Sequence, residues 1–270
     1  MQSDVLKRLF SLEGKTVLLT GAGGGIGHAL ALGFAGAGAR IALHARTQAK
    51  LDDIVADISR FGGESVCLTA ELGNLDEARR LVERAHAELG GLDVLVNCAA
   101  TNRRKPVAAV TEDDWDTIMT VDLKSLYFMS QTAYGFMRKQ RSGKIIHIGS
   151  LNSSFALGSV SVYGAAKGAV AQLTKVMAVE WAKDNIQVNC IIPGFVATPL
   201  SKPLWDDKYK ADWMRSRIPT RRPALPEEIV GPALLFASSA SSYVTGTSIV
   251  VDGGVLAGGW WEPDEVIAKL

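Results

Sequence analysis

Thr20-Gly21-Ala22-Gly23-Gly24-Gly25-Ile26-Gly27 is the stretch of this sequence that predicts its fold. It follows a short apolar run, Thr16–Thr20, that is typical of a buried strand, and it opens a helical pattern over Ile26–Gly36. Glycines at such a turn permit a tight bend and let the backbone approach a pyrophosphate, which the helix N-terminus stabilises. The stretch therefore predicts a dinucleotide site behind the first strand of an α/β fold.

The alternation of strand and helix continues along the chain. Further apolar runs rich in Val, Ile and Leu are typical of parallel strands buried on both faces. They are Arg40–His44, Ser65–Thr69, Asp93–Asn97, Lys144–Ile148, Gln187–Ile192 and Ser248–Val251. Helical patterns lie between them over Gln48–Phe61, Leu75–Leu89, Asp113–Gln140, Val160–Trp181 and Pro226–Ser238. Right-handed crossovers then predict a single Rossmann-like, doubly wound parallel sheet of about seven strands, with helices on both faces, in one domain over residues 1–270.

One segment interrupts this alternation. Ala197–Arg222 follows a predicted strand but carries three prolines and two tryptophans. Long interruptions inside a compact domain are usually functional, and ligands bind beyond the carboxyl ends of strands in open α/β sheets. We therefore interpret residues 197–222 as a substrate lid. A plain surface excursion is the alternative.

Composition excludes several classes of function. The 270 residues are 47% apolar and 21% charged, and a net charge of +1 favours neither nucleic acid nor an anionic membrane. No run reaches the length of a membrane span, and the N-terminus lacks the apolar core of a signal peptide. The 3 cysteines and 4 histidines show no metal-binding spacing, so we expect no metal. Sparse cysteines fit a reducing compartment, and we expect a cytoplasmic protein.

A second cluster carries chemistry. Tyr163 and Lys167 stand four residues apart in a predicted helix and so share one face. An ammonium close to a phenol stabilises the phenolate, and such a pair can give or take a proton near neutral pH. Ser150 follows the strand Lys144–Ile148 at its carboxyl end, where its hydroxyl could hold a substrate oxygen. A tyrosine packed beside a solvated lysine is the alternative.

These elements together resemble the short-chain dehydrogenase/reductase family. Asn97-Cys98-Ala99-Ala100 is similar to its NNAG motif, and Pro193-Gly194, with Thr198 beyond, is similar to its PG motif. Val250-Val251-Asp252-Gly253-Gly254 resembles its C-terminal VDGG. The resemblance implies an NAD(P)-dependent enzyme in which Tyr163 moves the proton, Lys167 assists it and holds the nicotinamide ribose, and Ser150 orients the substrate oxygen.

The resemblance also implies a cofactor site. The expected contacts are Gly21, Gly24, Gly25, Ile26, Gly27, Arg46, Glu71, Leu72, Asn97, Ala99, Tyr163, Lys167, Pro193, Gly194, Val196 and Thr198. NAD-preferring members carry an acidic residue at the end of the second strand, whereas this chain has His44-Ala45-Arg46 there. Arg46 could face a 2′-phosphate, so we predict that NADP(H) is preferred, with NAD(H) possible. Stacking of Arg46 on adenine is the alternative.

One residue departs from the family pattern. Asp122 stands where the family usually has a catalytic asparagine, whose main chain is thought to hold a water on the proton relay to the lysine. An aspartate can kink the helix in the same way. We therefore count Asp122 among the catalytic residues and expect an active enzyme.

Four stretches resemble gluconate 5-dehydrogenases and 2-dehydro-3-deoxygluconate dehydrogenases within the family. They are Asn102–Pro106, Lys124–Gln131, Glu180–Lys183 and Arg217–Pro219. This resemblance implies a small sugar acid, oxidised at a secondary alcohol or reduced at the ketone. Arg103 and Arg104 would bind its carboxylate beside Ser150 and Tyr163, and only one of these neighbours can point inward from an extended loop. A general carbonyl reductase or a non-catalytic cofactor-binding scaffold are the alternatives.

The family resemblance also implies a homotetramer. The helical patterns Asp113–Gln140 and Val160–Trp181 carry wide apolar surfaces, and the tail Gly253–Trp261 ends in two tryptophans. We expect these segments at the subunit interfaces.

Overall fold

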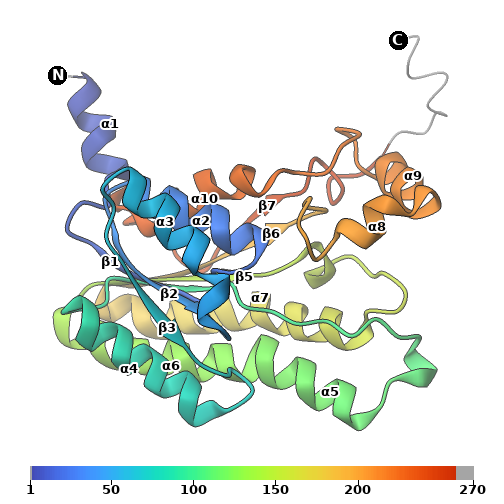
Figure 1. The fold of residues 1–270 in the computed structure, drawn as a ribbon, viewed down its shortest axis with the longest axis horizontal. Coiled ribbons are helices and arrows are strands. Elements are labelled where there is room, and N and C mark those ends of the chain that lie inside the picture. The colour runs from blue at the N-terminus through green and yellow to red at the C-terminus, as the bar shows by residue number, and fades with distance from the viewer. Residues whose placement is uncertain (1, 260–270) are drawn as a thin grey trace.

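The computed structural model describes residues 2–259 and contains one sheet of seven parallel strands (Figure 1). Their order across the sheet is β3-β2-β1-β4-β5-β6-β7. The strands are β1 (Thr16–Leu19), β2 (Arg40–Ala45), β3 (Ser65–Thr69), β4 (Val94–Asn97), β5 (Gly143–Ile148), β6 (Ile186–Pro193) and β7 (Ser248–Val251). The predicted doubly wound parallel sheet is confirmed.

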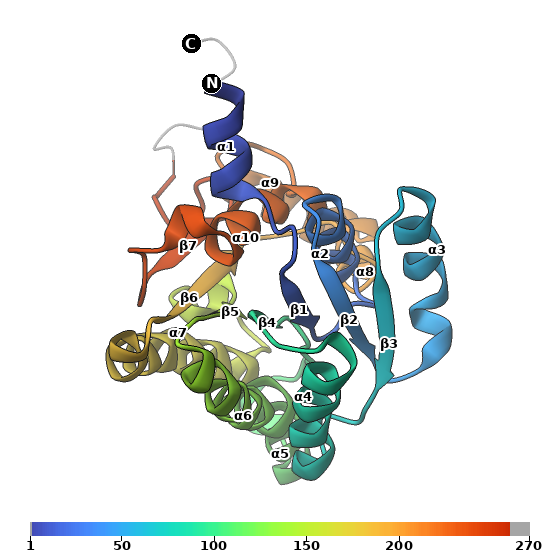
Figure 2. The ribbon, with the colours of Figure 1, turned by 90° about the vertical axis from the view of Figure 1, so that its left-hand side faces the viewer.

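Helices cover both faces of the sheet (Figure 2). One face carries α2 (Gly25–Gly36), α3 (Asp52–Arg60) and α10 (Val230–Ala237), and the other carries α4 (Leu75–Leu89), α6 (Ser125–Gln140) and α7 (Ser161–Trp181). The remaining helices are α1 (Gln2–Phe10), α5 (Glu112–Met119), α8 (Lys202–Asp206) and α9 (Lys208–Arg217). Among the described residues, none of the helices combines the length and apolar character that a membrane crossing requires.

The core lies in two layers because both faces of the sheet are covered. In β1, Val17 and Leu19 pack on the side of α2, while Leu18 between them packs on the side of α4. Side chains alternate along a strand, so a strand buried on both faces must be apolar at successive positions. This is why the strands appear in the sequence as continuous apolar runs.

The strand order reverses between β1 and β4, and this places the site. The glycine turn follows β1, Asn97 ends β4, Ser150 follows β5 and Pro193 ends β6. Their strands are neighbours in the sheet and parallel, so these residues gather at one edge. Ligands bind at such a reversal in open α/β sheets.

The predicted helix Asp113–Gln140 is divided in the structure. A π-helical turn, Thr120–Lys124, joins α5 to α6. Single π turns inside helices insert an extra residue into the turn and frequently occur at functional sites. This one contains Asp122.

Candidate active site

Tyr163 and Lys167 lie on one face of α7, as their spacing predicts. The Lys167 side chain is buried, and its Nζ lies 5.6 Å from the centroid of the half-buried Tyr163 ring. The same Nζ donates a hydrogen bond of 3.0 Å to the main-chain oxygen of Ile148, the last residue of β5. The ammonium is therefore held between the sheet edge and the tyrosine ring.

Ser150 begins a short 3-10 turn, Leu151–Ser153, directly behind β5. Its Oγ accepts a hydrogen bond of 3.1 Å from Asn152 N–H. The turn is fastened to α7, because Ser153 Oγ donates to the main-chain oxygen of Lys167 at 2.8 Å. The turn thus holds the serine segment against the helix that carries the tyrosine and lysine.

The side chain of Asp122, on the π-helical turn, lies close to Lys167. Its Oδ1 accepts a hydrogen bond of 2.7 Å from Thr101 N–H, in the loop after β4. Its Oδ2 lies 3.7 Å from Lys167 Nζ and makes no hydrogen bond to any described residue. Both side chains are almost fully buried, so the carboxylate and the ammonium form an ion pair behind the tyrosine.

Burial and this pairing act in opposite directions on the two charges. Burial raises the pKa of Asp122 to about 6, although the positive charge of Lys167 opposes the shift. Burial alone would lower the pKa of Lys167, but the surrounding negative charges, Asp122 first and then Tyr163, together outweigh it, and the pKa of Lys167 is raised. At neutral pH the pair is therefore ionised on both sides.

The glycine turn fits the phosphates of a dinucleotide. Helix α2 begins behind Gly24 without a side-chain cap, so the first N–H groups of the helix are left for a ligand oxygen. A Cβ on Gly27 would lie 2.1 Å from the main-chain oxygen of Gly21, so only glycine lets α2 sit this close to the turn. A Cβ on Gly25 would lie 2.8 Å from Thr198 Cγ2, which brings the segment after β6 onto the same helix end.

The other residues expected at the cofactor lie at or after the carboxyl ends of strands of the same sheet. Ala99 N–H donates to Thr20 Oγ1 at 3.2 Å, which joins the loop after β4 to the end of β1. The Asn97 side chain is turned inward, and its Nδ2 donates to Ser130 Oγ at 3.0 Å. Exposed Arg46 directly follows β2. Glu71, also exposed, and buried Leu72 follow the end of β3.

The segment 197–222 is pinned at its two ends. Val196 and Ala224 form an isolated parallel bridge, and Ala197 N–H donates to the main-chain oxygen of Ala224 at 2.8 Å. Between these ends lie α8 and α9, two short helices that were not predicted from the sequence. The two ends of the segment therefore lie side by side, with α8 and α9 between them along the chain.

The C-terminal VDGG packs on both ends of this arrangement. A Cβ on Gly194 would lie 2.6 Å from Asp252 Cα, so glycine permits the close approach of the two segments. The Asp252 carboxylate accepts hydrogen bonds from the N–H groups of Gly254 and Leu256.

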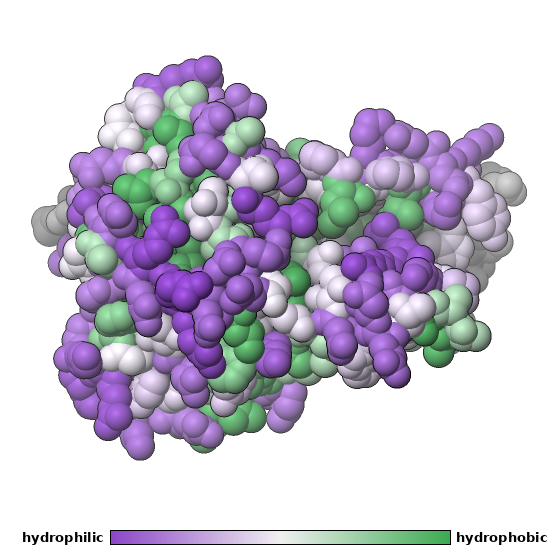
Figure 3. Space-filling model, turned by 60° about the horizontal axis from the view of Figure 1, so that its bottom comes forward, coloured by the Kyte–Doolittle hydropathy of each residue, from purple (hydrophilic) through white to green (hydrophobic). Residues whose placement is uncertain are grey.

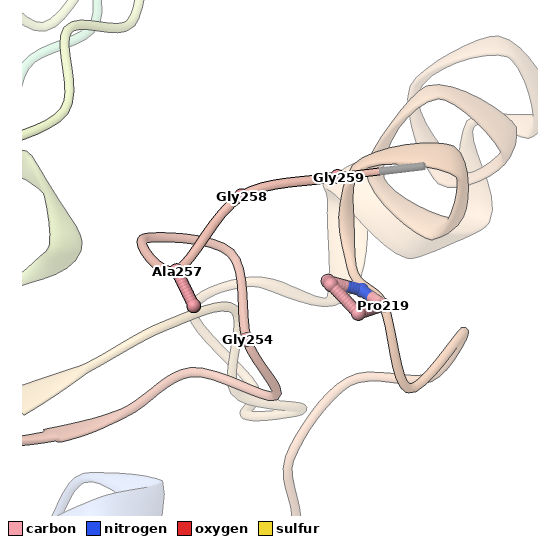
Figure 4. A pocket seen from close by; sticks show the side chains of 5 residues that line it. All are labelled: Pro219, Gly254, Ala257, Gly258 and Gly259. Atoms are coloured by element: carbon pink, nitrogen blue, oxygen red, sulfur yellow. The ribbon is translucent and has the colours of Figure 1, made fainter. Parts of the chain in front are cut away.

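A hollow of about 350 Å³ lies where this turn meets the end of α9 (Figure 4). It is lined by Pro219, Gly254, Ala257, Gly258 and Gly259 and contains none of the proposed catalytic side chains.

The two predicted substrate arginines have different surroundings. Arg103 donates to the carboxylates of Asp113 and Asp114, and Lys105 Nζ lies 2.5 Å from Asp114 Oδ2. Asp114 is a buried residue of α5 and also accepts from Thr111. Arg103 and Lys105 therefore fasten the loop to α5. Arg104, between them, is exposed and has no hydrogen bond or ion pair with the residues that the structure describes.

Comparison with known proteins gives close matches over nearly the whole chain. A family profile described as Enoyl-(Acyl carrier protein) reductase matches residues 21–256. The chain is 41% identical to the 2-dehydro-3-deoxy-D-gluconate 5-dehydrogenase of Dickeya dadantii (strain 3937), over 92% of this chain and 98% of that protein. It is 35% identical to the gluconate 5-dehydrogenase of Gluconobacter oxydans (strain 621H), over 92% of this chain and 96% of that protein.

A solved structure extends the match. The gluconate 5-dehydrogenase from Burkholderia cenocepacia J2315, in complex with NADP and tartrate, superposes with a TM-score of 0.89 at 35% identity. The superposition covers 94% of this chain and 99% of that chain.

Proposed function

Because this chain belongs to the short-chain dehydrogenase/reductase family and is an NAD(P)-dependent oxidoreductase, we propose that it interconverts a secondary alcohol and a ketone on a small sugar acid such as gluconate. The nicotinamide supplies the hydride chemistry when it is bound. Residues 197–222 form the lid of one domain that spans residues 1–270. The relatives that act on gluconate and its derivatives support this substrate class.

The catalytic roles are proposed for four side chains. In the reducing direction, the Tyr163 hydroxyl donates a proton to the carbonyl oxygen, which the Ser150 hydroxyl orients by a hydrogen bond. In the oxidising direction, the Tyr163 phenolate removes the proton of the substrate hydroxyl. Lys167, buried 5.6 Å from the ring centroid, stabilises the phenolate, and Asp122 holds Lys167 in place.

The exposed guanidinium of Arg104 is the observation that supports an acidic substrate. The loop after β4 is fastened at Arg103 and Lys105, so the guanidinium between them is left for a ligand. A planar guanidinium matches a carboxylate in a bidentate geometry. Arg103, by contrast, supports the loop.

The test compares Arg104→Ala with Arg103→Ala on 5-keto-gluconate and on a neutral hydroxyketone of similar size. Loss of a charge-assisted contact should raise KM for the acid about tenfold in Arg104→Ala, with little change for the neutral ketone. Arg103→Ala should affect both substrates alike, because it loosens the loop. If Arg104→Ala raises KM equally for the two substrates, the protein is better described as a general carbonyl reductase.

NADP(H) preference is the second part of the proposal. Arg46 follows β2, is exposed, and makes no ion pair with the described residues, and the residues beside it carry no carboxylate. Its guanidinium is thus available to a 2′-phosphate. Arg46→Asp should lower kcat/KM for NADP while leaving that for NAD equal or higher. A wild-type enzyme with higher kcat/KM for NAD than for NADP contradicts the preference.

A homotetramer in the cytoplasm completes the proposal. Trp115 of α5 and Tyr127 of α6 are large, exposed side chains, and so are Val176 and Val179 of α7. Figure 3 looks obliquely at the side of α4, α5 and α6, where small apolar patches alternate with hydrophilic residues. All 3 cysteines are free, which fits a reducing compartment. The expected tail contacts of Trp260 and Trp261 lie outside the described residues.

A further inference from the structure

His44 is a buried residue near the carboxyl end of β2 that the catalytic mechanism does not use. Its ring lies between the glycine turn and the end of β3. Gly21 N–H donates to His44 Nδ1 at 3.3 Å, and His44 Nε2 lies 3.2 Å from the main-chain oxygen of Ala70. A carbonyl oxygen only accepts, so Nε2 carries the proton and Nδ1 is the free acceptor.

The main chain of His44 adds a second bond to the same turn. Its carbonyl oxygen accepts from Ala22 N–H at 2.9 Å, so two successive residues of the turn are held by one residue of β2. Gly21 has a left-handed φ of +71°, and a Cβ there would lie 2.7 Å from Ala99 Cα. Gly21 is therefore packed between His44 and Ala99. The bond to Nδ1 fixes the peptide plane that enters the turn.

A proton on Nδ1 would break this arrangement. The imidazolium has two N–H donors and no acceptor, so Nδ1–H would face Gly21 N–H. Burial lowers the pKa of His44, while the Ala70 carbonyl and the negative charge of Glu71 oppose that shift. Glu71, two residues after the end of β3, is the charged group among the described residues that acts on the ring. Arg46 follows His44 by two positions, just after the end of β2. The neutral ring is the form that fits the site at neutral pH.

We propose that His44 is a positioning residue for the dinucleotide: its neutral ring holds the glycine turn ready for the pyrophosphate, and its protonation releases the turn and weakens cofactor binding. This inference rests on the proposed dinucleotide-dependent function. The turn in question carries the N-terminus of α2, whose N–H groups have no side-chain cap. A shift of the turn therefore moves the groups that would receive the phosphates.

Two variants distinguish the role of His44 as a hydrogen-bond acceptor from a role in packing alone. In His44→Asn, the amide oxygen can take the place of Nδ1 as acceptor for Gly21 N–H, and the side chain does not titrate. In His44→Leu, the acceptor is lost and the Gly21 N–H is left unpaired. His86→Asn is the matched control, because His86 lies on α4, where its ring stacks on Phe136.

The experiment measures the dissociation constants of NADP⁺ and NAD⁺ by isothermal titration calorimetry from pH 7.5 to 5.0. NAD⁺ is included because it lacks the 2′-phosphate, which titrates in the same range. At pH 7.5 we expect His44→Leu to bind about tenfold more weakly than wild type and His44→Asn to bind within about threefold. Toward pH 5.0 the affinity of wild type and His86→Asn for NAD⁺ should fall, while that of His44→Asn should stay nearly constant.

The possible outcomes distinguish the role of His44 from the proposed dinucleotide-dependent function. His44→Leu binding as tightly as wild type at pH 7.5, or His44→Asn losing affinity in acid as wild type does, overturns the role of His44. If His44→Leu does not fold, as judged by circular dichroism, the pH comparison of His44→Asn with wild type decides alone. A wild-type protein that binds neither dinucleotide at pH 7.5 contradicts the proposed function instead.

Discussion

Asp122 differs from the asparagine usual in the family by one charge, and that charge lies against Lys167. An aspartate in a helix usually faces solvent, because burying a carboxylate without a partner is unfavourable. Here the π turn directs the side chain inward, to Thr101 N–H and the ammonium. The carboxylate thus offsets part of the positive charge that Lys167 presents to Tyr163.

Asp122→Asn should therefore keep most of its turnover but change its pH dependence. The amide oxygen can still accept from Thr101 N–H. Below about pH 6, where Asp122 takes up a proton, the two enzymes should behave alike. Above that pH the Lys167 charge is not balanced in the variant, so alcohol oxidation should begin at a lower pH than in wild type. The measurement is kcat and kcat/KM from pH 5 to 10.

The control for this prediction is the reducing direction at pH 5, where Asp122 is protonated and wild type and variant should agree. A loss in kcat of about a hundredfold or more would show instead that the carboxylate takes part in proton transfer.

At the scale of elements, His147 of β5 links the sheet to two helices. Its Nδ1 lies 2.9 Å from Thr174 Oγ1 on α7, and its Nε2 lies 3.2 Å from Ser130 Oγ on α6. Ser130 in turn accepts from Asn97 of β4. These contacts tie the strands that carry the site to the two helices beneath them.

Acid should weaken this link. Burial lowers the pKa of His147 to about 3, with a smaller contribution from the charge of Lys167. In the unfolded chain, the His147 side chain takes up a proton near pH 6.5. Its contribution to the stability of the fold is therefore complete above that pH and is lost as the pH falls toward 3. The free energy of unfolding of wild type should fall by about 2 kcal/mol from this residue between pH 7 and pH 5.

His147→Asn provides the comparison. Its stability at pH 7 should be lower than that of wild type, but its further decrease on going to pH 5 should be smaller by that amount. Urea titrations at the two pH values measure both differences. Equal decreases in the two proteins would mean that His147 is not the acid-sensitive group.

At the scale of the molecule, α7 carries two exposed valines, Val176 and Val179, where water would meet a monomer. Val179 is 82% exposed, and the loop that carries the fully exposed Tyr243 packs beside it, because a Cβ on Gly246 would touch Ala178 Cβ at 3.3 Å. Large exposed apolar groups in one area are typical of an interface. The proposed tetramer would cover them.

Light scattering at micromolar concentration should give the mass of a tetramer for wild type. Val179→Glu should reduce it to that of a dimer, because a carboxylate would be buried without a partner at the interface. Phe61→Glu, an exposed apolar position at the end of α3, should leave the mass unchanged. A wild-type protein that scatters as a monomer would contradict the assembly.

The sequence by itself determined the features that depend on neighbours along the chain. The parallel sheet followed from apolar runs, since strands covered on both faces need apolar side chains at successive positions. The glycine turn, and the placing of Tyr163 and Lys167 on one helical face, followed from local geometry. The excursion over residues 197–222 was visible as a break in the pattern, but its two helices were not.

Only the tertiary structure decided which distant residues meet. Lys167 has a buried counter-ion in Asp122, and His44 holds Gly21. Arg103 is held by Asp114, while Arg104 pairs with none of the residues 2–259. No periodicity records these pairs, because each joins different elements and depends on how those elements pack. Spacing shows which face of an element a side chain occupies, whereas its partner, its burial and therefore its charge are set by what the fold brings against that face.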